Sequence, residues 1–185
     1  NLIFYFIALV LAFFSRKIFL DSLGADFVGL TGTLQNILGF LNLAEMGIGA
    51  AIGYVLYRPL FEKKKKKINE IISVLGYMYR LVGYVILAAG LLLAFFLPLI
   101  FKDAGFSLPI ISFVYFSFLT SSLISYFINY RQTLLGADQR NYVVTAYYQS
   151  ANIAKIIIQM ILAKHTGNYY IWAVVELSFG ILYSI

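Results

Sequence analysis

The stretch LVGYVILAAGLLLAFFLPLI, residues 81–100, contains no charged side chain and decides the fold class of this chain. A helix that crosses the hydrocarbon core of a membrane needs about 20 consecutive apolar residues, and this stretch supplies them. Strands of a membrane β-barrel alternate apolar and polar residues at every second position, whereas the run from Leu91 to Leu97 is apolar throughout. The stretch therefore predicts a membrane-spanning α-helix.

Further apolar blocks lie on both sides of this stretch, and no linker or low-complexity segment separates them. We therefore expect one all-α membrane domain over residues 1–185. The expected helices cover residues 1–20, 27–57, 71–101, 109–130, 142–163 and 169–185. Asn1 and Ile185 both lie inside apolar runs, so we expect the chain to be truncated at both ends.

The composition agrees with a lipid environment. Hydrophobic residues make up 62% of the chain and charged residues 12%, whereas soluble domains have roughly 45–50% and about 25%. A domain of this size cannot hide such a surplus in one core. The chain has no cysteine and a single histidine, His165, so thiolate metal sites and most nucleophile–base pairs are excluded. We expect a non-enzymatic protein without a cofactor or a metal site.

Basic residues predict the orientation of the helices. The net charge is +6, and the run Lys63 to Lys67 lies between two apolar blocks. Such a run is typical of a cytoplasmic loop near anionic lipid headgroups rather than of a nucleic-acid-binding surface. The loops on one predicted side carry eight basic residues: Arg58, Lys63 to Lys67, Arg131 and Arg140. The loops on the other side carry four: Arg16, Lys17, Lys102 and Lys164. The first side and the N-terminus should be cytoplasmic.

A stripe of polar residues runs along the expected helix 142–163. Its members recur at spacings of three and four residues and share one helical face: Thr145, Tyr148, Asn152, Lys155 and Gln159. Polar groups at membrane depth face the bundle interior or a wet cavity. A cationic, amide-lined face suits a polyhydroxylated or anionic substrate. The alternative is a structural hydrogen-bond seam between packed helices.

A second stripe lies in the expected helix 27–57. It contains Gln35, Asn42, Glu45 and Gly49, and Gly53 continues the spacing of small residues beyond it. Small residues four apart allow helices to approach closely. A carboxylate such as Glu45 in this setting is either paired with a cation or protonated.

Two oppositely charged residues lie at matched depth in the last two helices. Lys155 precedes Lys164 by nine residues, and Glu176 follows Tyr169 by seven. At about 1.5 Å per residue, both lie roughly 10–14 Å from the same membrane face. They can form a buried pair, with either a structural role or a role in transport. Arg16 either extends to the headgroups or faces the cavity.

Several segments together resemble a known family. They are residues 23–30 (LGADFVGL), 36–38 (NIL), 43–52 (LAEMGIGAAI), 56–60 (LYRPL) and 130–142 (YRQTLLGADQRNY). In this order they closely resemble the N-terminal half of the bacterial polysaccharide-repeat-unit flippases used for O-antigen and capsule. These flippases belong to the multidrug/oligosaccharidyl-lipid/polysaccharide exporter superfamily, whose members are MATE-like.

The resemblance implies a V-shaped transporter in the bacterial cytoplasmic membrane, with two lobes of six helices of which this chain is the first. The implied substrate is an undecaprenyl-pyrophosphate-linked oligosaccharide, which crosses by alternating access. The implied partners are membrane lipid, the missing C-terminal lobe and the polysaccharide polymerase machinery. The expected cavity residues are Arg16, Gln35, Asn42, Glu45, Tyr148, Asn152, Lys155, Gln159 and Glu176. The alternatives are a MATE-like ion-coupled drug/cation antiporter, which needs a carboxylate-dominated cavity, and a non-transporting membrane scaffold with a dry interior.

Overall fold

A computed structural model describes residues 2–43 and 47–183 of the chain. Over these residues the fold is all-helical and contains no strand. The helices are α1 (Leu2–Leu23), α2 (Ala25–Asn42), α3 (Ile48–Phe61), α4 (Lys65–Ile100), α5 (Leu108–Ile128), the 3₁₀ turn η2 (Asn129–Arg131), α6 (Gln132–Ala137), α7 (Asn141–Thr166) and α8 (Tyr169–Leu182).

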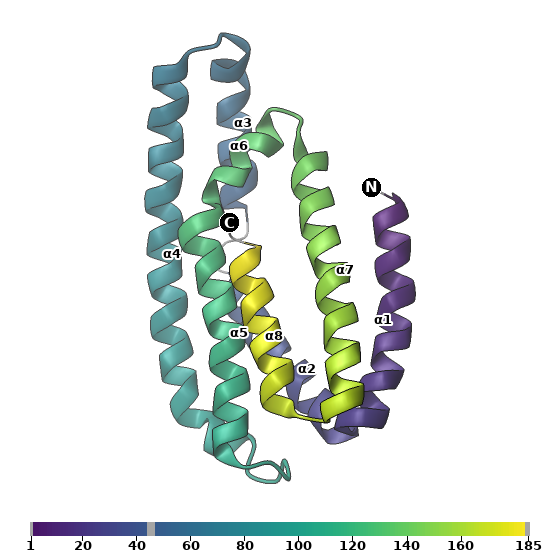
Figure 1. Cartoon of the computed structure of the whole chain (residues 1–185). Helices are drawn as coiled ribbons and strands as arrows, with labels where there is room; N and C mark the ends of the chain where they lie inside the picture. Colours follow the sequence, from purple (N-terminus) through teal and green to yellow (C-terminus); the bar gives the residue numbers. More distant parts are fainter. Residues whose placement is uncertain (1, 44–46, 184–185) are drawn as a thin grey trace.

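The helices run up and down, so the connections gather at two ends of the molecule (Figure 1). The α3–α4 turn with Lys63 and the α6–α7 turn lie at one end. The α1–α2, α4–α5 and α7–α8 connections lie at the other end. The two sets of loops that differ in their content of basic residues are therefore at opposite ends, in agreement with the sequence prediction.

Within the described residues, two helical stretches are long and apolar enough to cross a membrane. They are Lys65–Ile100, with 36 residues, and Leu108–Ala137, with 30 residues. The apolar helices α3 and α8 are shorter. Large apolar side chains also face outward, and Phe95 on α4 and Phe13 on α1 are 84% and 75% exposed. An apolar surface of this kind is the surface that lipid tails solvate.

The expected continuous helix over residues 27–57 is wrong. Helix α2 ends at Asn42 and α3 begins at Ile48, after Gly47. Gly47 has a φ of 93°, a left-handed conformation that glycine adopts readily and that no α-helix interior contains. Gln35 and Asn42 therefore do not share one continuous helical face with Gly49.

The other helix boundaries also differ from the expected ones. Helix α4 begins at Lys65, inside the lysine run, rather than at residue 71. The expected helix 109–130 ends at Ile128, and η2 and the short α6 follow it directly. The end of α7 has a plain cause, since Gly167 takes a left-handed conformation and Asn168 then caps α8 by accepting hydrogen bonds from the Tyr170 and Ile171 N–H groups.

Aromatic side chains fill the core at the end of the molecule that holds the α7–α8 turn. The Phe27 ring centroid lies 4.6 Å from that of Tyr169 and 5.5 Å from that of Trp172. Trp172 also contacts Phe19 and Phe118, at 6.1 Å in each case. We call these five residues the aromatic cluster. It joins α1, α2, α5 and α8 within the hydrophobic core.

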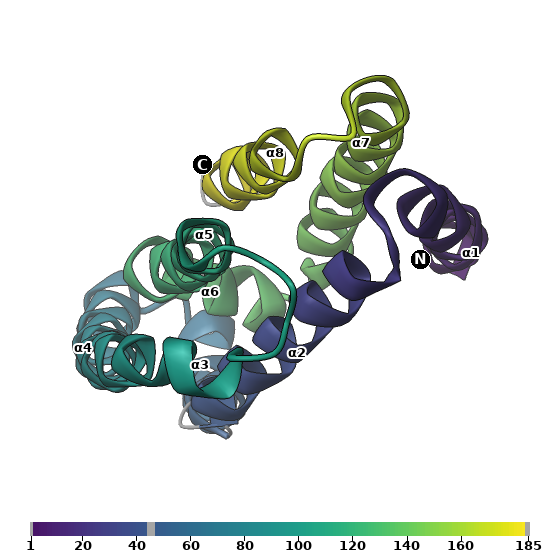
Figure 2. The same cartoon turned by 90° about the horizontal axis from the view of Figure 1, so that it is seen from below.

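Helix α8 lies beside both α5 and α7, while α2 crosses obliquely from α1 toward α4 (Figure 2). Gly180 permits the close approach of α8 to α5. A Cβ atom at this position would overlap the Ser121 side chain and lie 3.2 Å from the Ser121 Cα. The interior polar groups of α5, α7 and α8 consequently face a common space.

Candidate functional site

An ion pair joins α7 to α8 in the middle of the bundle. Lys155 Nζ donates to Glu176 Oε1 at 2.8 Å, and both side chains are 14% exposed. Gln159 Nε2, on the next turn of α7, donates to Glu176 Oε2 at 2.9 Å and to the Trp172 carbonyl at 3.3 Å. Both carboxylate oxygens of Glu176 therefore accept a hydrogen bond, and the charge of Lys155 is matched by an acidic partner.

Two tyrosines extend this cluster toward the C-terminal end of α8. The rings of Tyr148 and Tyr183 are stacked, with centroids 4.7 Å apart and an interplanar angle of 23°. Lys155 Nζ lies 5.8 Å from the Tyr183 ring centroid, within the range of a cation–π contact. The cation of Lys155 is thus held between a carboxylate and an aromatic face.

A cavity of about 340 Å³ opens in front of this cluster. We call it the polar cavity. Its walls come from α2, α5, α7 and the C-terminal part of α8, and its lining residues are Asn42, Ser121, Ser122, Ser125, Tyr126, Tyr148, Glu176, Gly180 and Tyr183. Most of these side chains carry a hydroxyl or an amide, which is unusual for the interior of an apolar helix bundle.

Hydrogen bonds organise the wall that α2 and α5 share. Asn42 Oδ1 accepts from the Ser122 hydroxyl and from the Tyr126 hydroxyl, each at 3.1 Å. Ser121 Oγ donates to the Ser117 carbonyl on its own helix at 2.9 Å. Asn42 lies in the last turn of α2, so these bonds hold the end of that helix against α5, before the break between α2 and α3.

The negative charge of Glu176 at the polar cavity is neutralised by a residue outside the cavity lining. Among the described residues Glu176 is the one charged residue that lines the cavity, and Lys155 and Gln159 reach Glu176 from the α7 side without lining the cavity themselves. A carboxylate that already accepts from an ammonium and an amide presents little net negative charge to the cavity. The site is therefore polar and close to neutral.

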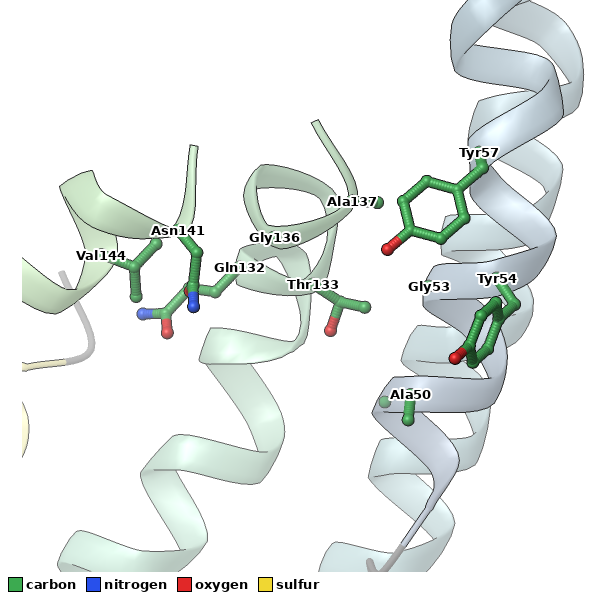
Figure 3. A pocket seen from close by; sticks show the side chains of 11 residues that line it. Ala50, Gly53, Tyr54, Tyr57, Gln132, Thr133, Gly136, Ala137, Asn141 and Val144 are labelled. Carbon is green, nitrogen blue, oxygen red and sulfur yellow. The ribbon is translucent and has the colours of Figure 1, made fainter. Parts of the chain in front are cut away.

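A second cavity, of about 480 Å³, lies between α3, α6 and the start of α7. Figure 3 shows the Tyr57 ring and the Thr133 side chain pointing into it from α3 and α6. Gly53 also lines this space, and no atom lies within 4 Å of where its Cβ would be, whereas a Cβ at Gly49 would lie 3.2 Å from the Tyr79 hydroxyl. The predicted close packing of small residues thus holds at Gly49 and not at Gly53.

The structure brings together some of the predicted site residues and separates others. Three line the polar cavity: Asn42, Tyr148 and Glu176. Lys155 and Gln159 lie behind it, where they hold Glu176.

Three predicted residues do not join this group. Asn152 is half-buried on α7 and does not line the polar cavity. Arg16 is exposed on α1, and Gln35 is exposed on α2, where it faces a separate space beside Phe40. The expectation that these three share one cavity with Glu176 is corrected accordingly. Glu45 lies outside the described residues.

Sequence reasoning missed the serines of α5 and Tyr183. A usable signal was present, because Ser117, Ser121 and Ser125 recur every four residues and so share one face of an otherwise apolar helix. The sequence also contained a signal for Gly180, since it lies four residues after Glu176 and so shares one helical face with it.

Comparison of the chain with protein-family models, with curated proteins and with solved structures yields no match. The geometry of the site and the sequence resemblance are accordingly the basis for a functional proposal.

Proposed function

We propose that this chain is one lobe of a flippase that moves lipid-linked oligosaccharides across the bacterial cytoplasmic membrane. The observation that carries the proposal is the polar cavity, a hydroxyl- and amide-lined space of about 340 Å³ inside a bundle whose outer faces are apolar. Polar groups at membrane depth are costly and generally mark a substrate path. A polar interior within an apolar exterior is the arrangement that a membrane transporter for a hydrophilic group needs.

In this proposal the chain crosses the membrane six times. The crossings are α1, the broken pair α2–α3, α4, α5 with its continuation, α7 and α8. The proposal is supported by the up-and-down order of the helices and by the two stretches that are long and apolar enough to span (Figure 1). The end with the lysine run is assigned to the cytoplasm, because basic residues accumulate in cytoplasmic loops.

The choice of substrate rests on the resemblance to polysaccharide-repeat-unit flippases, in residues 43–52 and 130–142 above all. Those proteins act on undecaprenyl-pyrophosphate-linked oligosaccharides by alternating access between two lobes. The aromatic cluster fits this scheme, since it lies at the end that holds the α7–α8 turn, opposite the end that holds the α3–α4 turn (Figure 1). It would form the closed outer end of an inward-facing lobe, with a second lobe and the polysaccharide polymerase machinery as partners.

A second candidate function is a MATE-like cation antiporter. It is favoured by one observation, namely that the charged residue lining the polar cavity is the carboxylate of Glu176. The contact of Glu176 with Lys155 argues for the flippase, because a carboxylate that is already neutralised attracts an organic cation weakly. A dry membrane scaffold is disfavoured by the presence of the cavity itself.

Deletion of the gene in the bacterium that encodes this protein separates the two candidates. The flippase proposal predicts that surface polysaccharide falls and that lipid-linked oligosaccharide accumulates in the membrane, while efflux of cationic dyes is unchanged. The full-length gene should restore the surface polysaccharide. Normal surface polysaccharide together with lost dye efflux would instead support the antiporter.

A further inference from the structure

We propose that the polar cavity binds the uncharged sugar portion of the substrate and leaves the pyrophosphate outside it. This inference rests on the proposed flippase function and deepens it, because it assigns one chemical part of the substrate to one set of residues. The described residues that carry it are Glu176, Lys155, Asn42 and the serines of α5.

The first step of the argument concerns charge. A pyrophosphate site needs uncompensated cations or several free N–H donors, typically from arginine or lysine. No lysine or arginine lines the cavity in the described part of the chain, and Lys155 is held 2.8 Å from Glu176 Oε1 behind the cavity wall. Among the described residues, the charged group that lines the cavity is the Glu176 carboxylate, which Lys155 already neutralises, so the cavity offers phosphate no free cation. The polar cavity is therefore unsuited to the anionic part of the substrate.

The second step concerns hydrogen bonding. The wall offers hydroxyls from Ser121, Ser122 and Ser125, the amide of Asn42, and the Glu176 carboxylate as an acceptor. The Asn42 side-chain oxygen accepts two hydrogen bonds within the wall. The NH₂ group of the same side chain therefore remains as the donor that Asn42 offers to a ligand. Closely spaced donors and acceptors of this kind match the alternating hydroxyls of a sugar ring, and unlike an ionic site they favour an uncharged partner.

The third step concerns shape. The stacked pair Tyr148–Tyr183 lines one side of the cavity and offers an apolar ring surface against which the C–H face of a sugar can pack. Gly180 and Ser121 also line the cavity, and these small residues take up little of its volume. A volume of about 340 Å³ lies near the lower limit of small-molecule sites, roughly 300–1,000 Å³. The space suits one or two sugar units rather than a whole lipid-linked oligosaccharide.

The test measures which part of the substrate binds. Full-length protein in lipid nanodiscs is examined by saturation-transfer NMR with three separate probes: neutral monosaccharides (glucose, galactose and N-acetylglucosamine), inorganic pyrophosphate, and tetraethylammonium. We expect saturation transfer to at least one monosaccharide, which neither pyrophosphate nor tetraethylammonium displaces.

Matched serine variants locate the signal. Ser122→Ala combined with Ser125→Ala should weaken monosaccharide binding about tenfold, the change expected from the loss of one or two modest hydrogen bonds. Ser178→Ala should leave it unchanged, because Ser178 is exposed on α8 and bonds only to the Val174 carbonyl among the described residues. Intrinsic fluorescence of Trp172, the single tryptophan, reports whether each variant is folded.

The inference is overturned if pyrophosphate displaces the sugar, if tetraethylammonium does so, or if no monosaccharide binds. It is also overturned if the double serine variant, correctly folded, binds sugar as well as the unaltered protein does. None of these results contradicts the flippase proposal, which fails only if the protein does not move lipid-linked oligosaccharide at all. Transport by the double serine variant, measured in parallel, keeps the two failures apart.

Discussion

Lys155 Nζ lies 2.8 Å from Glu176 Oε1, and Gln159 holds the second oxygen of the same carboxylate. The three residues join α7 to α8 beside the polar cavity, which Glu176 itself lines. The matched depths of Lys155 and Glu176 allowed a pair, which is present, and the pairing takes Lys155 out of the cavity lining. This relationship determines both the charge of the site and the stability of the helix pair.

The first prediction concerns this ion pair. Lys155→Ala should destabilise the folded protein by about 3–5 kcal/mol, because it leaves a carboxylate that is mostly buried without its cation. Adding Glu176→Gln should recover most of the loss, since the neutral amide no longer needs a cation. The measurement is thermal unfolding of the protein in detergent for both single variants and for the double variant.

Arg140→Ala is the matched control for this cycle. Arg140 pairs with Asp138 at 3.0 Å, but both side chains are well exposed, so its loss should change stability by only about 0–1 kcal/mol. If Lys155→Ala proves as harmless as Arg140→Ala, the pair has no structural role and Lys155 is free to act on a ligand.

The possibility that Lys155 pairs with Glu176 could be inferred from the sequence for a simple physical reason. Two helices joined by a short turn are antiparallel neighbours, and a fixed rise per residue turns sequence separation into depth. The all-helical class and the grouping of basic loops followed from equally local rules. These features required no knowledge of which helices pack together.

The features that sequence reasoning missed depend on tertiary contacts. The break between α2 and α3 at Gly47 lies inside an apolar run, and a glycine within such a run does not reveal the sign of its φ angle. The polar cavity depends on α8 meeting α5 at Gly180, a contact between helices that are distant in the sequence. Arg16 and Gln35 were grouped with Glu176 by polarity alone, and the packing separates them.

The second prediction concerns Gly180. Gly180→Ala should lower the melting temperature and narrow the polar cavity, because the added Cβ overlaps the Ser121 side chain. Combining it with Ser121→Gly should restore part of the stability. Gly32→Ala is the control, since Gly32 is helical and no atom lies within 4 Å of where its Cβ would be. A harmless Gly180→Ala would mean that α8 does not approach α5 so closely.

The third prediction concerns the tip of the α3–α4 hairpin. Hydrogen bonds from Lys64 and Arg58 lower the pKa of Glu62 from 4.5 to about 2. A carboxyl group whose pKa is lowered in the folded protein stabilises the tip at pH values above its ordinary pKa. This stabilisation is lost as the pH falls toward the lowered pKa. Carboxyl NMR at low salt should therefore show Glu62 ionised down to about pH 2. High salt should raise the midpoint, because the pair is exposed and screened.

Two variants test the cause of this shift. Lys64→Ala together with Arg58→Ala should return the pKa of Glu62 toward 4.5, whereas Lys66→Ala in the same lysine run should leave it low. Equal midpoints in all three proteins would contradict the assignment of the shift to these two hydrogen bonds.

The fourth prediction concerns the aromatic cluster. The unaltered chain has no cysteine, so single cysteines can be labelled selectively in intact cells with an impermeant maleimide. Gly105→Cys should react from outside and Lys66→Cys should be protected. Ser125→Cys, inside the polar cavity, should also be protected from outside. Adding Phe27→Ala and Trp172→Ala should expose it, because those rings close the outer end.

Different results of this experiment would contradict the proposed membrane orientation and the proposed closure of the outer end. Labelling of Lys66→Cys with protection of Gly105→Cys would invert the orientation. Rapid labelling of Ser125→Cys without the aromatic substitutions would show that the cluster does not seal the outer end. Permeabilised cells provide the control that each cysteine can react.

The most direct measurement of the central claim is transport by the purified full-length protein in liposomes. A polyprenyl-pyrophosphate-linked oligosaccharide is incorporated into both leaflets, and a glycosidase added outside cleaves only what is exposed there. The account predicts that protein-containing liposomes expose nearly all of the substrate with time, whereas protein-free liposomes keep the inner leaflet protected. If the protected fraction is the same with and without protein, the chain does not belong to a flippase for lipid-linked oligosaccharides.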